Sequence, residues 1–131
     1  MTLKIEVTRN SKQPGFYELR LDGRLDTETH GQLEKALKQT DVKDAKGIRL
    51  DLAKLTYISS MGLRVVMRLM KDLKARSAVF QTVNVQPQIK KVFDIAAALP
   101  TEAVFASVEE ADAYLDLMQK RALRGDTKRD E

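Results

Sequence analysis

The side chains with the clearest chemical potential are two adjacent hydroxyls, Ser59 and Ser60. They follow an apolar segment that indicates a strand ending at Ile58, and they precede a run of residues with helical periodicity. The sequence therefore places two hydroxyl groups at the start of a helix. Serine is also a preferred N-cap residue, so on composition alone the favoured interpretation is that Ser59 or Ser60 only caps this helix and that Gly62 permits close packing.

Side chains that could support catalysis are few. The 131 residues contain no cysteine and one histidine, His30, which excludes thiolate metal sites, multi-histidine metal sites and cysteine nucleophiles. The six glycines form neither of the standard phosphate-binding loops, and there is no nucleophile elbow. Carboxylates such as Asp22, Asp26 and Asp51 could pair after folding, but solvated or capping roles are the commoner fate of such residues. The sequence thus predicts a non-enzyme without a metal or nucleotide cofactor.

The chain is basic, but its charges are mixed in sign. The formal net charge is +4 and the sequence pI is about 9.4. Aromatic residues make up only 5%, whereas nucleic-acid-binding surfaces combine a basic patch with stacking aromatics. No apolar run reaches the roughly 18 residues of a membrane span, and residues 1–7 lack the features of a signal peptide. We therefore expect a cytoplasmic protein that neither binds nucleic acid directly nor inserts into a membrane.

The elements that must position the two serines follow from periodicity. Alternation of apolar and polar residues predicts a hairpin of residues 3–8 and 17–21 around a Pro-Gly turn. Three more strands are predicted at residues 48–58, 78–83 and 103–106. Four helices are predicted: one capped by Asp26 or Thr27, one opened by Ser59 and Ser60, one from Pro87, and one from Ser107.

This order, β-β-α-β-α-β-α-β-α, predicts a single-domain α/β fold. Alternating strands and helices favour a mixed, mainly parallel sheet of about five strands covered by about four helices. The domain is expected to span residues 1–123, because apolar periodicity stops near Leu123. Residues 124–131 are predicted to be a polar, disordered tail.

The second predicted helix has two distinct faces. Its buried stripe is expected to consist of residues at helical spacing, namely Leu63, Val66, Met67, Met70 and Leu73. Met61, Arg64, Val65 and Arg68 follow the same spacing on the other side and are expected to point outward. Because Met and Arg are enriched at protein interfaces, this outward set is a candidate partner-binding surface.

Three segments together resemble the STAS domain, the fold of sulfate-transporter C-termini and of bacterial anti-sigma factor antagonists. Residues 51–63 are similar to the family pattern D-L-x-x-[VL]-x-[FY]-[IM]-D-S-[ST]-G-L. Gly23-Arg24-Leu25-Asp26 resembles the family's G-x-L-D, and residues 85–94 resemble the segment that leads into its third helix. The resemblance spans residues 3–118 and implies a STAS-like fold with the order given above.

The resemblance also implies a regulatory function. In antagonists of this family, a serine is phosphorylated by a partner serine kinase that is also the anti-sigma factor, and a separate phosphatase opposes it. That serine falls on Ser60, whereas the family's aspartate falls on Ser59 and its second Ser/Thr on Met61. The implied phosphorylation site is Ser60, with Ser59 as a second acceptor. Together with the outward set of the helix, this gives the predicted partner-binding residues, namely Asp26, Ser59, Ser60, Met61, Arg64, Val65 and Arg68.

Two other functions stay open at this point. A STAS domain could be a scaffold subunit of a stressosome-like or lipid-transport complex, without a phosphorylation cycle. A small enzyme is the third alternative, and it rests only on unpaired carboxylates. Identification of the binding partner, and of any phosphoserine, would discriminate among them.

Overall fold

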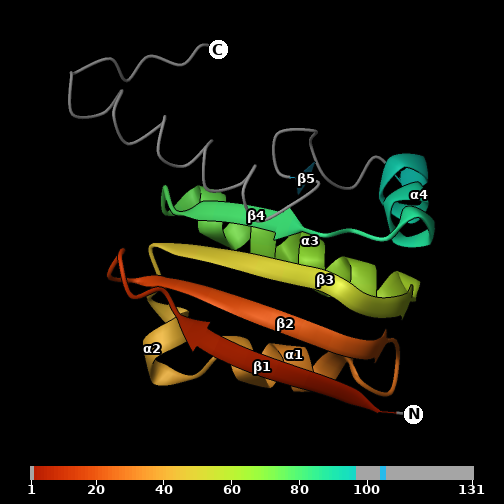
Figure 1. Ribbon diagram of the computed structural model, residues 1–131, viewed down its shortest axis with the longest axis horizontal. Coiled ribbons are helices and arrows are strands. Elements are labelled where there is room, and N and C mark those ends of the chain that lie inside the picture. The colour runs from red at the N-terminus through yellow and green to blue at the C-terminus, as the bar shows by residue number, and fades with distance from the viewer. Residues whose placement is uncertain (1, 97–103, 106–131) are drawn as a thin grey trace.

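The computed structural model describes residues 2–96 and 104–105, and these residues form a five-stranded sheet with helices (Figure 1). The strands are β1 (Leu3–Arg9), β2 (Phe16–Leu25), β3 (Gly47–Ile58), β4 (Val79–Val83) and β5 (Val104–Phe105), and they lie side by side in that order. β1 and β2 pair antiparallel, and each later pair is parallel. The predicted class, a single mixed α/β domain with a mainly parallel sheet, is confirmed.

The first two strands form the predicted hairpin. Alternation places Ile5 opposite Leu21, with apolar side chains on the face that the helices cover. In the connecting turn, the Asn10 Oδ1 accepts hydrogen bonds from the backbone N–H groups of Lys12 and Gln13 at 2.8 and 3.1 Å. Gly15 then adopts a φ of 86°, which returns the chain to β2.

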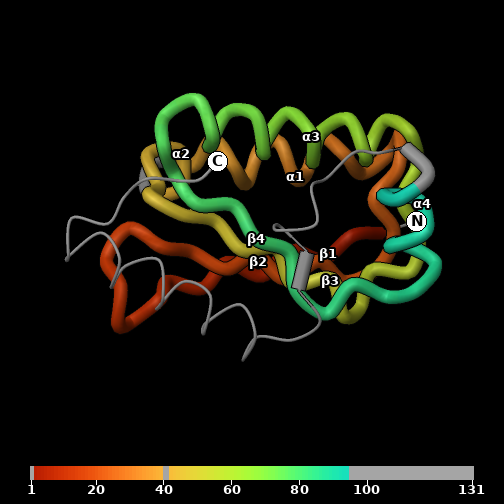
Figure 2. The backbone as a smooth tube through the Cα atoms, turned by 90° about the horizontal axis from the view of Figure 1, so that it is seen from above, coloured from red at the N-terminus to blue at the C-terminus, as the bar shows by residue number. Residues whose placement is uncertain are grey.

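The described helices are α1 (His30–Leu37), α2 (Thr40–Lys43), α3 (Ser60–Ala75) and α4 (Pro87–Ala96). Figure 2 shows α1, α2 and α3 over one face of the sheet and α4 at its end. The sequence does not predict α2, because residues 39–46 look like the polar end of the preceding helix. This short helix buries Val42 in the core, and Ala45, which follows the helix, is buried as well. The helix predicted from Ser107 and the predicted tail lie outside the described residues.

The predicted buried stripe of α3 is confirmed at Leu63, Val66 and Leu73, but the buried face of the helix is broader than predicted. Its buried residues are Gly62, Leu63, Val65, Val66, Leu69 and Leu73. The expectation that Val65 points outward is wrong, because its side chain is only 2% exposed. The physical reason is that α1 packs beside α3 over the same face of the sheet, so α3 is buried on two sides (Figure 2). Met67 and Met70 are expected to point inward but are only partly buried, although Met67 does pack against the core.

The core lies between the sheet and the helices α1 and α3. Large side chains with little or no exposure, such as Leu19, Leu50, Leu33 and Leu73, form one continuous cluster there. Within residues 2–96 and 104–105, no helix is long and apolar enough to cross a membrane. The same described residues contain no group of three His, Asp or Glu side chains that could hold a metal ion.

Candidate functional site

The two parallel strands β2 and β3 end beside each other, and the candidate site is built on their carboxyl ends. Leu25, the last residue of β2, is in register with Ile58, the last residue of β3. Directly after Ile58, the Ser59 N–H donates a hydrogen bond to the Leu25 carbonyl at 2.9 Å. The start of α3 is therefore fixed against the segment that follows β2, which is a common position for binding sites in open α/β sheets.

Gly62 allows this close approach. A Cβ atom at this position would lie 2.6 Å from the Leu25 carbonyl oxygen and 2.8 Å from the Leu25 Cγ. Only glycine leaves enough room for the first turn of α3 to rest on the end of β2. The sequence-based interpretation that Gly62 permits close packing is consistent with this geometry.

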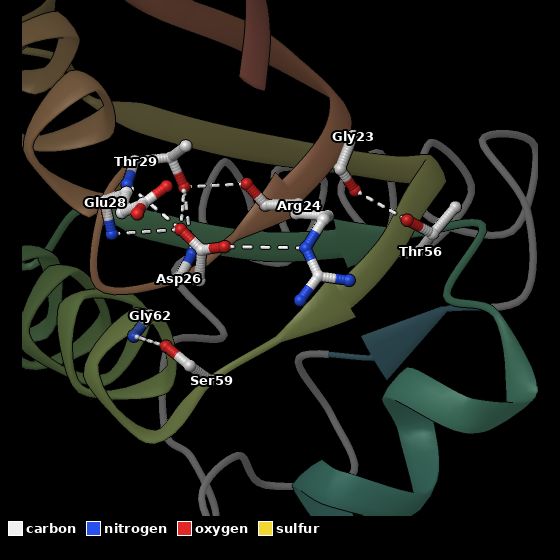
Figure 3. A network of polar contacts seen from close by, with 8 residues as sticks. All are labelled: Gly23, Arg24, Asp26, Glu28, Thr29, Thr56, Ser59 and Gly62. Carbon is white, nitrogen blue, oxygen red and sulfur yellow. Dashed lines mark hydrogen bonds and ion pairs between the residues drawn. The ribbon is translucent and has the colours of Figure 1, made fainter. Parts of the chain in front are cut away.

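Ser59 and Ser60 have different surroundings. Ser59 is the N-cap of α3, and its Oγ accepts a hydrogen bond from the Gly62 N–H at 3.1 Å (Figure 3). Ser60 is the first residue of the helix, and its side chain is exposed to solvent. Of the two hydroxyls that the sequence places here, one is thus engaged in capping and the other is accessible.

Asp26 fixes the segment after β2. Its Oδ1 accepts hydrogen bonds from the backbone N–H groups of Glu28 and Thr29 at 3.0 and 3.1 Å, which is the pattern of a capping residue. The Thr29 hydroxyl lies 3.1 Å from the same Oδ1 and 2.7 Å from the Arg24 carbonyl oxygen, and its one proton is shared between these two acceptors (Figure 3). The prediction that Asp26 or Thr27 caps the first helix is wrong, because the N-cap of α1 is Thr29 and Asp26 instead accepts hydrogen bonds within the turn that precedes this helix.

These contacts set the charge state of Asp26. Desolvation raises the pKa of this carboxyl, because the residue is only 9% exposed. Hydrogen bonds from the Thr29 side chain, from the backbone of Glu28 and Thr29, and from Arg24 act in the opposite direction. Their sum outweighs desolvation and holds the pKa of Asp26 below its ordinary value of 3.8. Asp26 is consequently ionised at neutral pH, and its oxygens contact Glu28, Thr29 and Arg24 of the same chain.

Arg24 and Tyr57 form an exposed pair beside Asp26 that sequence reasoning missed. The Arg24 guanidinium carbon lies 4.0 Å from the centroid of the Tyr57 ring, and its Nε lies 3.5 Å from the Asp26 Oδ2. Tyr57 is 41% exposed, and among the residues that the structure describes only Val7 is another exposed large hydrophobic side chain. Both residues lie in the segments that resemble the family patterns, but only the strand register, which pairs Arg24 with Tyr57, brings them together.

The surface of α3 that faces solvent forms a shallow concavity of about 470 Å³. We call it the α3 outer face, and its residues are Ser60, Leu63, Arg64, Met67, Arg68 and Lys71. It includes Arg64 and Arg68, as expected, and the Arg68 Nη1 lies 2.8 Å from Glu34 Oε2 on α1. Met61 is partly buried outside this concavity, and Val65 lies in the groove between α1 and α3.

The other residues considered for chemistry have structural neighbours of their own. His30 begins α1, and its Nδ1 lies 3.5 Å from the Glu34 Oε1 one turn later. The Asp51 carboxylate lies 3.7 Å from the Arg20 Nε and accepts a hydrogen bond from the Asn84 side chain. At the start of α3, by contrast, the exposed Ser60 lines a concavity together with the basic side chains of Arg64, Arg68 and Lys71.

The sequence and the fold agree with one family of proteins. The chain matches the STAS domain family over residues 8–111, and it belongs to that family.

Particular relatives are anti-sigma factor antagonists. The protein BtrV of Bordetella bronchiseptica, a candidate anti-sigma factor antagonist, is 34% identical over 93 residues, which cover 71% of this chain and 80% of BtrV. The anti-sigma-B factor antagonist of Staphylococcus aureus is 30% identical over 95 residues, which cover 72% and 85% of the two chains. This protein is thus a STAS protein similar to anti-sigma factor antagonists.

A solved structure shows the same fold. The anti-sigma factor antagonist SpoIIAA of Bacillus, in its unphosphorylated form, superposes with a TM-score of 0.68 at 21% identity, covering 88% of this chain and 96% of SpoIIAA. Its phosphorylated form gives a TM-score of 0.59 at the same identity, covering 87% and 99% of the two chains.

Proposed function

We propose that this protein is a phosphorylation-controlled partner switch of the anti-sigma factor antagonist type. Its partner is a serine kinase that is also an anti-sigma factor, and a separate phosphatase reverses the modification. The proposal rests on the difference between the two serines at the start of α3. Ser59 is the N-cap and accepts a hydrogen bond from Gly62, whereas Ser60 is exposed. The relatives named above, and the existence of a phosphorylated form of SpoIIAA, support the same cycle.

The chemistry of the cycle is a phosphoryl transfer to and from Ser60. The kinase forms a bond between the Ser60 Oγ and the γ-phosphorus of ATP, ADP leaves, and the hydroxyl proton passes to a base of the kinase. The phosphatase adds water to the phosphorus, which releases inorganic phosphate and restores the hydroxyl. Because the cycle consumes ATP, we place the protein in the cytoplasm.

A phosphate on Ser60 is compatible with the fold. The modification adds a charge of about −1.5 to −2 at an exposed position. At the first residue of α3, free backbone N–H groups and the helix dipole favour an anion. The effect of phosphorylation therefore falls on the interface: a partner packed against Ser60 must desolvate the charge or separate from it.

Ser59 is the less suitable acceptor. Its Oγ accepts the capping hydrogen bond from Gly62, so a phosphoryl group there would disturb the cap. The family's aspartate is absent at this position, and with it a negative charge beside the acceptor. We expect the cognate kinase to recognise Ser60 between a neutral Ser59 and Met61.

The proposed binding surface combines two neighbouring regions. The first is the α3 outer face, with Ser60, Arg64 and Arg68 and with the partly buried Met61 beside it. The second is the Arg24–Tyr57 pair, which exposes an aromatic ring and a guanidinium. Asp26 contributes by holding Arg24 and the turn after β2, and Val65 is not included because it is buried.

The test uses serine kinases from the source genome and purified full-length protein. Each kinase is incubated with ATP and with the wild type, Ser60→Ala or Ser59→Ala, and the product is mapped by mass spectrometry. We expect phosphate on Ser60, no incorporation in Ser60→Ala, and retained incorporation in Ser59→Ala.

Binding to the same kinase provides the second measurement. Ser60→Asp should weaken the complex, and Ser60→Ala should bind whether or not ATP is present. Phosphate found only at another residue contradicts the Ser60 assignment. A partner that stays bound in the presence of ATP while the wild-type protein remains unphosphorylated contradicts the switch and favours a scaffold role.

A further inference from the structure

The charged side chains of the α3 outer face are all basic, but they are not equivalent. Arg68 is engaged by Glu34 of α1, with 2.8 Å between the Arg68 Nη1 and the Glu34 Oε2. Lys71 lies three turns after Ser60 on the same face. Arg64 is exposed, and within residues 2–96 and 104–105 it has no ion-pair partner. The guanidinium of Arg64 is therefore available to bind an anion near Ser60.

Helix geometry brings Arg64 to Ser60. Residues at i and i+4 are neighbours on a helix surface, with about 5–6 Å between their Cβ atoms. Helical side chains also lean toward the N-terminus, so the long Arg64 side chain extends over the turn that contains Ser60. An anion four residues before a cation is the more favourable order of such a pair. The guanidinium fork can in addition donate two hydrogen bonds to two phosphate oxygens.

We propose that, when Ser60 carries a phosphoryl group, the Arg64 guanidinium binds the phosphate within the same helix and is thereby withdrawn from the partner. This inference deepens the proposed function and rests on it, because it assumes that Ser60 is the modified residue. Phosphorylation of Ser60 would then weaken partner binding in two ways. The partner meets a new negative charge and also loses the one unpaired arginine of the α3 outer face.

The test introduces phosphoserine at position 60 by genetic encoding, so that it needs no kinase. A failure of Arg64 to bind the phosphate is then distinguishable from a failure of Ser60 as a kinase substrate. The second pKa of the phosphate, ordinarily about 6, is measured by ³¹P NMR titration in the phosphoprotein and in its Arg64→Gln variant. We expect Arg64→Gln to raise this pKa by about 0.2–0.4 units, because the doubly charged phosphate loses its paired cation.

Arg68→Gln is the matched control, since it removes the same charge from the same face but from a residue that Glu34 holds. It should move the phosphate pKa by less than about 0.1 unit at moderate salt, where exposed charges more than about 10 Å apart are screened. A second readout is the Nε–H resonance of Arg64, which should shift when phosphoserine replaces Ser60 while that of Arg68 does not.

Two results would overturn the proposal. One is a phosphate pKa in Arg64→Gln within about 0.1 unit of that in the unsubstituted phosphoprotein. The other is an equal effect of Arg68→Gln, because the phosphate would then respond to the general basic charge of the face. Both variants change exposed residues, and an unchanged thermal unfolding midpoint verifies that each is folded.

Discussion

At the residue scale, one hydrogen bond distinguishes Ser59 from Ser60. The Ser59 Oγ satisfies the Gly62 N–H, which would otherwise be one of the unpaired donors at the start of α3. Ser59→Ala should therefore lower the free energy of unfolding by about 1 kcal/mol, the usual value of a serine cap. Ser60→Ala, at an exposed position, should change it by less than about 0.5 kcal/mol. Urea unfolding of the two variants measures both values.

The reverse order of these effects would contradict the assignment. If Ser60→Ala were the destabilising change, Ser60 would be the cap and its hydroxyl would be engaged in the fold. The stability comparison thus tests the accessibility on which the proposed modification depends, and it does so without a kinase.

A second effect at this scale is the pH dependence caused by Asp26. Its pKa is lower in the folded protein than the ordinary value of 3.8, so ionisation of Asp26 stabilises the fold above about pH 4. This contribution is lost as the pH falls through the lowered folded pKa, because both states then bind the proton. Asp26→Asn keeps an oxygen that can accept from Glu28 and Thr29 but carries no charge toward Arg24.

The expected result is that Asp26→Asn is less stable than the wild type at pH 7 and that this difference narrows on acidification. The free energy of unfolding, measured in urea between pH 7 and pH 2, gives both curves. Parallel curves over the whole range would show that the Asp26 charge does not contribute to stability.

At the element scale, the contact between α3 and β2 depends on a missing side chain. The Cβ of an alanine at position 62 would lie too close to the backbone of Leu25, so Gly62→Ala must displace the start of α3. We expect a loss of about 1–3 kcal/mol, as for other overpacked sites. Gly31→Ala is the matched control, because Gly31 lies in α1 with no atom within 4 Å of the added Cβ. That change should stabilise the protein by about 0.5–1 kcal/mol through helix propensity.

Thermal or urea unfolding of both glycine variants separates the two effects. A Gly62→Ala protein as stable as the wild type would mean that α3 can shift on the sheet at little cost. The geometry that presents Ser60 would then be less firmly held than the contact with Leu25 indicates.

The same scale shows what the sequence can predict and what it cannot. Periodicity predicts the hairpin and the amphipathic character of α3, because both are local properties of the chain. It does not predict which helix flanks α3, so it places Val65 outside and misses Leu69, which is 6% exposed. The sequence also hides the Arg24–Tyr57 pair, since a contact between residues far apart in the chain requires the register of two strands.

At the scale of the whole molecule, Ser60 and the Arg24–Tyr57 pair lie at one end of the sheet. β3 begins at Gly47 and ends at Ile58, so Lys46 and Ser59 lie at opposite ends of this strand. Arg24, Tyr57, Ser60 and the start of α3 lie at the carboxyl end, whereas the core behind them holds α3 on the sheet. A charge added to this end can change binding and leave the packing intact.

The position of Arg64 on the proposed binding surface predicts how charge and salt affect the association of the unmodified protein with its kinase partner. Exposed charges at the rim of an interface act mainly on the rate of association, and salt screens them. Arg64→Glu should therefore slow association by about threefold or more at low ionic strength, with the difference disappearing in high salt. Lys46→Glu changes the net charge equally at the opposite end and should leave the rate nearly unchanged. Stopped-flow mixing with the kinase identified by phosphorylation measures both rates. If Lys46→Glu slows association as much as Arg64→Glu does, the partner responds to the total charge of the molecule, and the α3 outer face is not its docking surface.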